Sequence, residues 1–194
     1  MKHDAIYTVT NTTGQVKGSF GDVPESKPFP FPYKEDFESY SYGETPRYFS
    51  DQKGTFETCQ SPKGGICLTQ IMPKQGILWY NVWLLKPHTL FGDLNWQDYA
   101  IEGDVLLTGG YVEIGGRYAK REKLGYRWIL KSDERCQLNW QYTTLASGQI
   151  KKFKPLDWHH LLLEMKGDHI TGFIELFLHQ EICQKNQKTI KTKN

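Results

Sequence analysis

The sequence predicts an all-β protein, with a β-sandwich or jelly roll as its architecture. Aromatic side chains make up 14% of the 194 residues, a composition that suits half-buried sheet surfaces. Short segments of alternating apolar and polar residues recur between glycine-rich turns, and no interior segment has the apolar period of a long helix. The length and the 38% hydrophobic content suit one domain with a substantial core.

The two-residue alternation is clearest in "YAIEGDVLL". Ile101, Val105 and Leu107 fall on one face, and Glu102 and Asp104 fall on the other. This is the pattern of a half-buried strand, because successive side chains of a strand point to opposite faces.

A second segment, "CQLNWQY", alternates in the same way. Leu138, Trp140 and Tyr142 share one face, against Asn139 and Gln141. After a first short strand at residues 4–11, the sequence predicts strands at 65–71, 77–85, 99–107, 111–118, 126–131, 136–142, 158–166 and 169–174.

Residues 12–33 are rich in Gly, Pro and Ser and predict a linker or an extended arm. Prolines at positions 24, 28, 30 and 32 remove backbone donors and fix φ, so we expect an extended chain there. Phe29 and Phe31 are expected to hold this arm against a neighbouring surface.

Charge and composition exclude several classes of protein. The net charge of +2 gives no overall field for binding nucleic acid or an acidic membrane surface. No apolar run is long enough to cross a membrane, and residues 1–11 lack the apolar core of a signal peptide. The four cysteines have no C-x-x-C spacing, which argues against structural zinc and a thioredoxin-type motif.

Cys59 and Cys67 flank "QSPKGGI", a turn sequence between two short predicted strands. The pair could therefore face each other and close a small disulfide in an oxidising compartment. Two buried free thiols are the alternative, since unpaired cysteine often behaves as a small apolar residue.

Other motifs have simpler structural interpretations. His159 and His160 are neighbours on a predicted strand and point to opposite faces, so they cannot chelate one metal ion together. "GGYVEIGGR" is not followed by Lys-Ser/Thr and a helix, which argues against a phosphate-binding loop. The Asp and Glu residues show no spacing that identifies a catalytic pair.

Five short motifs occur in the order "TTGQVKGSF", "SKPFPFPYKEDFE", "FSDQKGTFE", "LFGDLNW" and "GDHITGFI". Together they resemble the C-terminal lectin-like domain of the galactosylceramidase (galactocerebrosidase) family, glycoside hydrolases that remove galactose from galactosylceramide. The resemblance implies a parent with a β/α barrel, a β-sandwich and this jelly roll. Both catalytic glutamates of that retaining enzyme belong to the barrel, so no catalytic residue is assigned here.

The resemblance divides the chain into four parts. Residues 1–11 would be the end strand of a preceding β-sandwich, 12–33 the arm, and 34–174 the lectin-like jelly roll. Residues 175–194 form a divergent basic tail without the expected F-D-N-F segment, so the jelly roll would lack its closing strands. The tail is also expected to be disordered.

Trp96 completes the motif Gly92, Asp93, Asn95, Trp96. The residues alone favour a core position, because a Trp beside a strand commonly fills a sandwich edge. The family resemblance implies instead that its ring forms an apolar wall near the galactose, since an aromatic ring stacks on the C–H face of a sugar.

The resemblance also implies a calcium ion, and Asp36 and Asp51 are the acids at matching motif positions. The family is lysosomal, which agrees with a glycosylation sequon at Asn11. The expected partners are a galactosylated lipid or glycan and the barrel and sandwich domains of the parent.

Three functions therefore stay open. The chain could be part of a galactosylceramidase, a stand-alone carbohydrate-binding lectin domain, or a structural domain whose arm docks on another sandwich.

Overall fold

A computed structural model of the chain describes residues 11, 13, 14, 25–72, 86–118, 125–151 and 153–174. The chain divides into two compact units, Met1–Tyr33 and Lys34–Asn194, at the end of the predicted arm. Residues 25–33 of the first unit have no regular secondary structure. The predicted strands at 4–11 and 77–85 lie outside the described residues, apart from Asn11, and so does the tail at 175–194.

The second unit confirms the all-β prediction for the residues that the structure describes. Its strands are β1 (Ser50–Lys53), β2 (Phe56–Gln60), β3 (Ile66–Gln70), β4 (His88–Leu90), β5 (Tyr99–Leu106), β6 (Tyr111–Gly116), β7 (Tyr126–Lys131), β8 (Arg135–Trp140), β9 (Thr143–Gln149), β10 (Trp158–Lys166) and β11 (His169–Ile174). Among those residues there is no helix able to cross a membrane.

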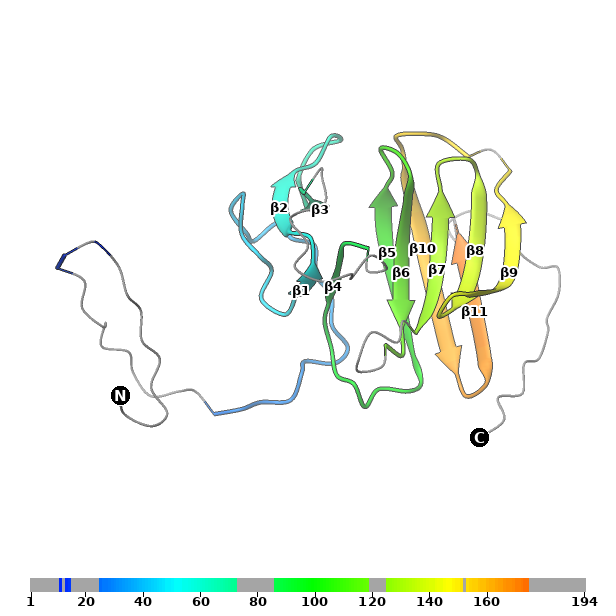
Figure 1. Cartoon of the computed structure of the whole chain (residues 1–194), viewed down its shortest axis with the longest axis horizontal. Helices are drawn as coiled ribbons and strands as arrows, with labels where there is room; N and C mark the ends of the chain where they lie inside the picture. The colour runs from blue at the N-terminus through cyan, green and yellow to red at the C-terminus, as the bar shows by residue number, and fades with distance from the viewer. Residues whose placement is uncertain are drawn as a thin grey trace. The chain divides into compact units, whose positions relative to one another are not determined.

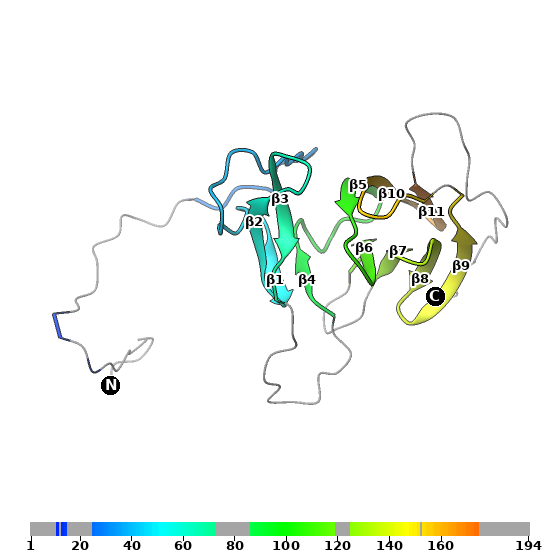
Figure 2. The same ribbon diagram turned by 90° about the horizontal axis from the view of Figure 1, so that it is seen from above.

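Two antiparallel sheets form a sandwich (Figures 1 and 2). One sheet has the order β11-β10-β5, and the other has the order β6-β7-β8-β9. The inward-facing side chains of both sheets form one core cluster, which comprises Leu107, Trp128, Leu130, Cys136, Leu138, Ile150, Leu161, Leu163, Met165 and Ile174. This arrangement is consistent with a lectin-like β-sandwich, and the finer jelly-roll topology remains a prediction.

Trp128 joins the two sheets at the centre of this core. Its indole Nε1 donates a hydrogen bond of 3.0 Å to the carbonyl oxygen of Phe173, and its ring lies against Gly172. A Cβ at position 172 would meet the ring at 2.5 Å, so the absence of a side chain allows the indole to lie this close to β11.

Two smaller antiparallel sheets, β1-β4 and β2-β3, complete the second unit. Thr58 on β2 is fully buried, and its hydroxyl donates to the carbonyl oxygen of Ser41 at 2.6 Å and accepts from the Glu44 amide at 3.0 Å. Lys63, in the turn between β2 and β3, forms an ion pair of 3.0 Å with Asp157, just before β10. These contacts connect the hairpin to the preceding segment and to the sandwich.

The structure shortens two predicted strands. β6 ends at Gly116 and not at residue 118, because Arg117 has a positive φ of 51°. β8 ends at Trp140, and Gln141 follows with a positive φ of 50°, so residues 141 and 142 form a turn. Tyr142 is 62% exposed and does not share the inward face of Leu138 and Trp140. The apolar alternation extended past the strand because an aromatic residue happened to continue the two-residue period through the turn.

Candidate functional site

The motif Gly92 to Trp96 forms a compact turn between β4 and β5. The Asp93 carboxylate accepts a hydrogen bond of 2.8 Å from the Asn95 amide, and the Asp93 carbonyl accepts one of 3.2 Å from the Trp96 amide. Gly92 has a φ of 99°, and a Cβ there would meet the Trp96 ring at 2.5 Å. The glycine therefore satisfies two demands, a positive φ and a close approach of the indole.

Trp96 is half-buried, and it is not a member of the core cluster formed by the described residues. Its ring meets that of Tyr99 edge to face, with centroids 5.7 Å apart. Tyr99 in turn packs against the core cluster. The indole is thus supported by the sandwich while part of it stays accessible, which is how a ring must be held to contact a ligand.

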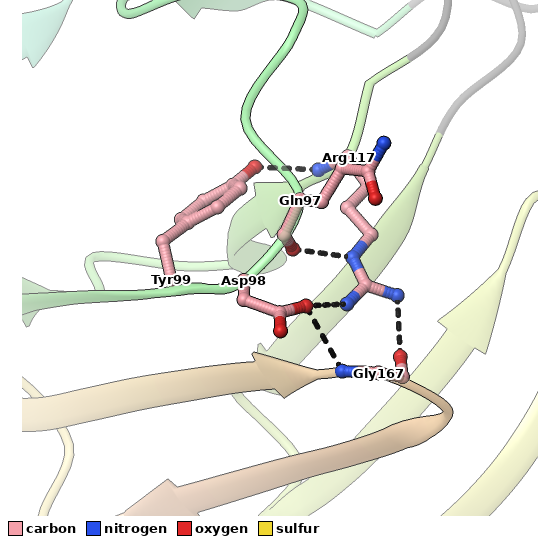
Figure 3. Close-up of polar contacts among 5 residues, drawn as sticks. All are labelled: Gln97, Asp98, Tyr99, Arg117 and Gly167. Carbon is pink, nitrogen blue, oxygen red and sulfur yellow. Dashed lines mark hydrogen bonds and ion pairs between the residues drawn. The ribbon is translucent and has the colours of Figure 1, made fainter.

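Arg117 binds the residues that follow Trp96 (Figure 3). Its Nε donates to the Gln97 carbonyl at 2.7 Å, and one terminal nitrogen donates to the Asp98 carboxylate at 3.2 Å. The other terminal nitrogen donates to the Gly167 carbonyl at 2.8 Å, in the turn between β10 and β11. All three nitrogens of one planar group are therefore used.

Two further hydrogen bonds complete this network. The Arg117 amide donates to the Tyr99 hydroxyl at 2.6 Å, and the Gly167 amide donates to the Asp98 carboxylate at 2.9 Å. Arg117 follows β6 with a φ of 51°, and its side chain is only 21% exposed. A non-glycine residue rarely adopts such a φ, and here the surrounding hydrogen bonds hold it there. The network fixes the end of the Trp96 turn to both sheets.

The two candidate calcium ligands make separate local contacts. An Asp36 carboxylate oxygen accepts a hydrogen bond of 3.1 Å from the Glu38 amide, and one Asp51 oxygen accepts one of 2.8 Å from the Phe56 amide. The other Asp51 oxygen is buried and has no hydrogen-bond partner among the described residues. The same is true of the hydroxyl of Thr89, the residue on β4 that pairs with Asp51 in the register. Calcium takes six to eight oxygen ligands. The described residues thus offer a partial donor set around Asp51, and Asp36 is exposed.

The two neighbouring histidines lie on opposite faces of β10. His159 is buried, stacks on Phe153 at 4.7 Å and has its Nε2 3.0 Å from the Lys154 carbonyl. The imidazole of His160 lies 2.8 Å from a carboxylate oxygen of Asp104, its register partner on β5. No group of three or more His, Cys, Asp or Glu side chains in the described part of the chain could hold a metal ion.

Sequence reasoning missed a polar pair on the side of the four-stranded sheet that faces away from the core. Arg127 on β7 donates to the Glu113 carboxylate on β6 at 3.2 Å and to the Gln141 carbonyl at 2.5 Å. Burial raises the pKa of Glu113, and the nearby Arg127 opposes that rise. The alternation of Glu113 with Val112 and Ile114 was the available signal, because it places the carboxyl opposite the core face.

Together, the two facing antiparallel sheets and the aromatic ring at a rigid turn define a lectin-like β-sandwich. Residues 51–193, more than half of the chain, match the family model "Galactocerebrosidase, C-terminal lectin domain". The chain belongs to this family.

Curated relatives called galactocerebrosidase support the same assignment. The chain is 33% identical to the Mus musculus protein over 191 residues, 29% identical to the Homo sapiens protein over 193, and 28% identical to the Danio rerio protein over 191. Each alignment covers 90% of this chain but only 27% to 28% of the relative. The chain therefore spans little more than a quarter of the length of these relatives.

Proposed function

We propose that this chain is the lectin-like portion of a galactosylceramidase-type glycosidase and that Trp96 forms one wall of the galactose pocket. The nucleophile and the acid/base of such a retaining enzyme are two carboxylates about 5 Å apart across the scissile bond. In this proposal both belong to a barrel domain, and the present residues supply substrate contact and scaffold. The substrate is a galactosylated lipid.

The observation that carries the proposal is the way in which Trp96 is held. Gly92 and Tyr99 contact its ring, and Arg117 fixes the two residues that follow it. A ring held in this way contributes to sugar binding through its fixed orientation. It presents one face to the C–H surface of the sugar, and binding then costs little further side-chain entropy.

Activity measurements on a chimera test this proposal. Residues 34–174 would replace the matching segment of the Mus musculus relative, and hydrolysis of galactosylceramide would be compared with that of the chimera carrying Trp96→Ala. We expect a folded, active chimera whose kcat/KM falls on substitution. Equal kcat/KM for the two proteins would contradict a role for Trp96 in the pocket. The isolated chain is expected to show no galactosidase activity of its own.

A stand-alone carbohydrate-binding domain is the second candidate, favoured by the partly accessible indole beside the exposed Leu94. Titration of the isolated chain with galactose separates the two. A pocket wall that needs a barrel should show no measurable affinity, whereas a free lectin should bind. Saturable binding that Trp96→Ala abolishes would favour the lectin.

Calcium and the cellular location belong to the same proposal. Asp51 is the better of the two candidate ligands, because one of its oxygens is buried without a partner among the described residues. Further oxygens would have to come from elsewhere in the protein. A lysosomal location and glycosylation at Asn11 are also proposed, and the exposed position of Asn11 fits an acceptor site.

A further inference from the structure

The hairpin formed by β2 and β3 places two cysteines directly opposite each other. Cys59 pairs with Cys67 in the register of the two strands, and both thiols are half-buried and free. The two cysteines therefore face each other, as the disulfide interpretation requires, but no bond joins them, and neither residue is fully buried as the alternative supposed.

The hydrogen bonds at the two ends of the β2-β3 ladder show whether Cys59 and Cys67 form a hydrogen-bonded or a non-hydrogen-bonded pair. The Ser61 amide donates to the Gly65 carbonyl at 2.9 Å, and the Ile71 amide donates to the Thr55 carbonyl at 3.0 Å. Hydrogen-bonded and non-hydrogen-bonded pairs alternate along an antiparallel ladder, so the Cys59–Cys67 pair is hydrogen-bonded, with an expected Cα separation of about 5.5 Å. This lies within the range of about 4.4 to 6.8 Å that a disulfide spans.

From this register we propose that Cys59 and Cys67 are a site of reversible oxidation to an intrachain disulfide. In a hydrogen-bonded pair the Cβ atoms lie about 5.5 Å apart, so closure to the separation of about 3.5 to 4.5 Å in a disulfide requires them to approach by about 1 to 2 Å. The described part of the sheet has only two strands, and such a small movement disturbs no third strand.

The oxidant is a disulfide, either a small molecule such as oxidised glutathione or the active-site disulfide of an oxidoreductase. One cysteine thiolate attacks a sulfur of the oxidant, forming a mixed disulfide and expelling the first oxidant thiol. The second cysteine thiolate then attacks the sulfur of the first, which forms the intrachain bond and expels the second oxidant thiol. Two electrons pass to the oxidant, and the two cysteine protons end on its thiols or in solvent.

The consequence would be local, because the hairpin connects two other parts of the unit. Thr58 beside Cys59 is hydrogen-bonded to Ser41 and Glu44, and Lys63 in the enclosed turn is paired with Asp157. A disulfide across the hairpin would keep β2 and β3 paired between the contacts of Thr58 and that of Lys63, even when the hydrogen bonds of the turn break. It would also protect the turn, whose Gly64 and Lys63 are exposed, from proteolysis.

The full chain with Cys183→Ser tests this proposal, since this background removes the cysteine outside the described residues. The folded protein is treated with oxidised or reduced glutathione and alkylated, and its peptides are mapped by mass spectrometry. We expect a Cys59–Cys67 crosslink that lacks two hydrogen atoms and is reversed by dithiothreitol. Cys136 is 2% exposed and serves as the internal control, because it should stay unmodified until the chain unfolds.

Two single variants and the double serine variant complete the experiment. Cys59→Ser and Cys67→Ser should each stop at the mixed disulfide with glutathione, and circular dichroism would verify that both are folded. Oxidation should raise the Tm of the background protein by about 5 °C, as expected for a short closed loop, and leave the Tm of the double serine variant unchanged. The proposal is overturned if the folded background protein accumulates only mixed disulfides, or if both thiols remain fully alkylatable after oxidation.

Discussion

A terminal nitrogen of Arg117 donates a hydrogen bond of 2.8 Å to the carbonyl oxygen of Gly167, and so joins the end of β6 to the turn between β10 and β11. The same guanidinium holds Gln97 and Asp98, the residues that follow Trp96. A single side chain therefore connects the sandwich to the turn that carries the proposed sugar contact. Its planar shape is essential, because the three acceptors lie in different directions.

Arg117→Lys should therefore destabilise the protein although it keeps the charge. An ammonium group cannot reach the three acceptors together, and the loss of charge-assisted hydrogen bonds should lower the free energy of unfolding by about 2 to 3 kcal/mol. Denaturant unfolding would measure this change. Arg135→Lys is the control, because Arg135 binds Asp133 in an exposed pair and its replacement should leave stability almost unchanged. Equal effects of the two substitutions would contradict the structural role of Arg117.

Gly172→Ala should strain the contact between the two sheets. The new Cβ would meet the buried Trp128 ring at 2.5 Å, and an overpacked core costs about 1 to 3 kcal/mol. The comparison is Gly103→Ala on β5, where no atom lies within 4 Å of the added methyl group. Thermal unfolding should give a clearly lower Tm for the first variant and little change for the second. A neutral Gly172→Ala would mean that Trp128 can withdraw from β11.

The raised pKa of Glu113 predicts a pH dependence of stability. Burial raises this pKa above the ordinary value of 4.5, so the folded state holds the proton more tightly than the unfolded state does. The corresponding stability is fully present below the unfolded pKa and is lost as the pH rises through the folded pKa. The free energy of unfolding, measured from pH 4 upward, should therefore include a component that decreases as the pH rises above the ordinary pKa of 4.5. Glu113→Gln should remove that component, and an unchanged pH profile would rule out Glu113 as its source.

Calcium is expected to change the stability of this chain very little. A ligand that binds the folded state raises Tm by mass action, but the donor set around Asp51 is partial among the described residues. Differential scanning fluorimetry with millimolar calcium, compared with magnesium and with chelator, should give nearly equal Tm values. A clear increase with calcium alone, abolished by Asp51→Asn but not by Asp36→Asn, would show instead that the site is complete.

The sequence was most informative where burial differs between the two faces of a strand. The alternation of Ile101 and Glu102 predicts β5, because one face of the strand is apolar and the other is in water. β9 was not predicted, because its sequence TTLASGQ has small and polar residues on both faces. β1 and β4 were also missed, since strands of four and three residues are too short to show a period.

The candidate site was predictable in part for a similar reason. The conformation of the turn from Gly92 to Trp96 requires particular residue types, so its motif can be recognised in the sequence. The role of Arg117 depends on the backbone carbonyls of Gln97 and Gly167, 20 and 50 residues away. Any residue provides a carbonyl, and such a contact therefore leaves no trace in the sequence.

The two interpretations of Trp96 predict opposite effects of Trp96→Ala, measured in the chimera described above. If the ring forms the sugar wall, its loss removes an aromatic contact worth about 1 kcal/mol, and kcat/KM should fall by roughly tenfold or less. Unfolding should change little, because the ring is half-buried and lies outside the core cluster of the described residues. If Trp96 instead fills the core, the same substitution should cost about 3 to 5 kcal/mol of stability.

One variant measured for both melting and turnover therefore distinguishes the two roles. Trp96→Phe is the matched control, since it keeps an aromatic face beside Tyr99 and should retain most of the activity that Trp96→Ala loses. We expect a small change in Tm and a graded loss of kcat/KM from Trp through Phe to Ala. A large drop in Tm combined with normal turnover per folded molecule would identify Trp96 as a core residue and remove it from the pocket.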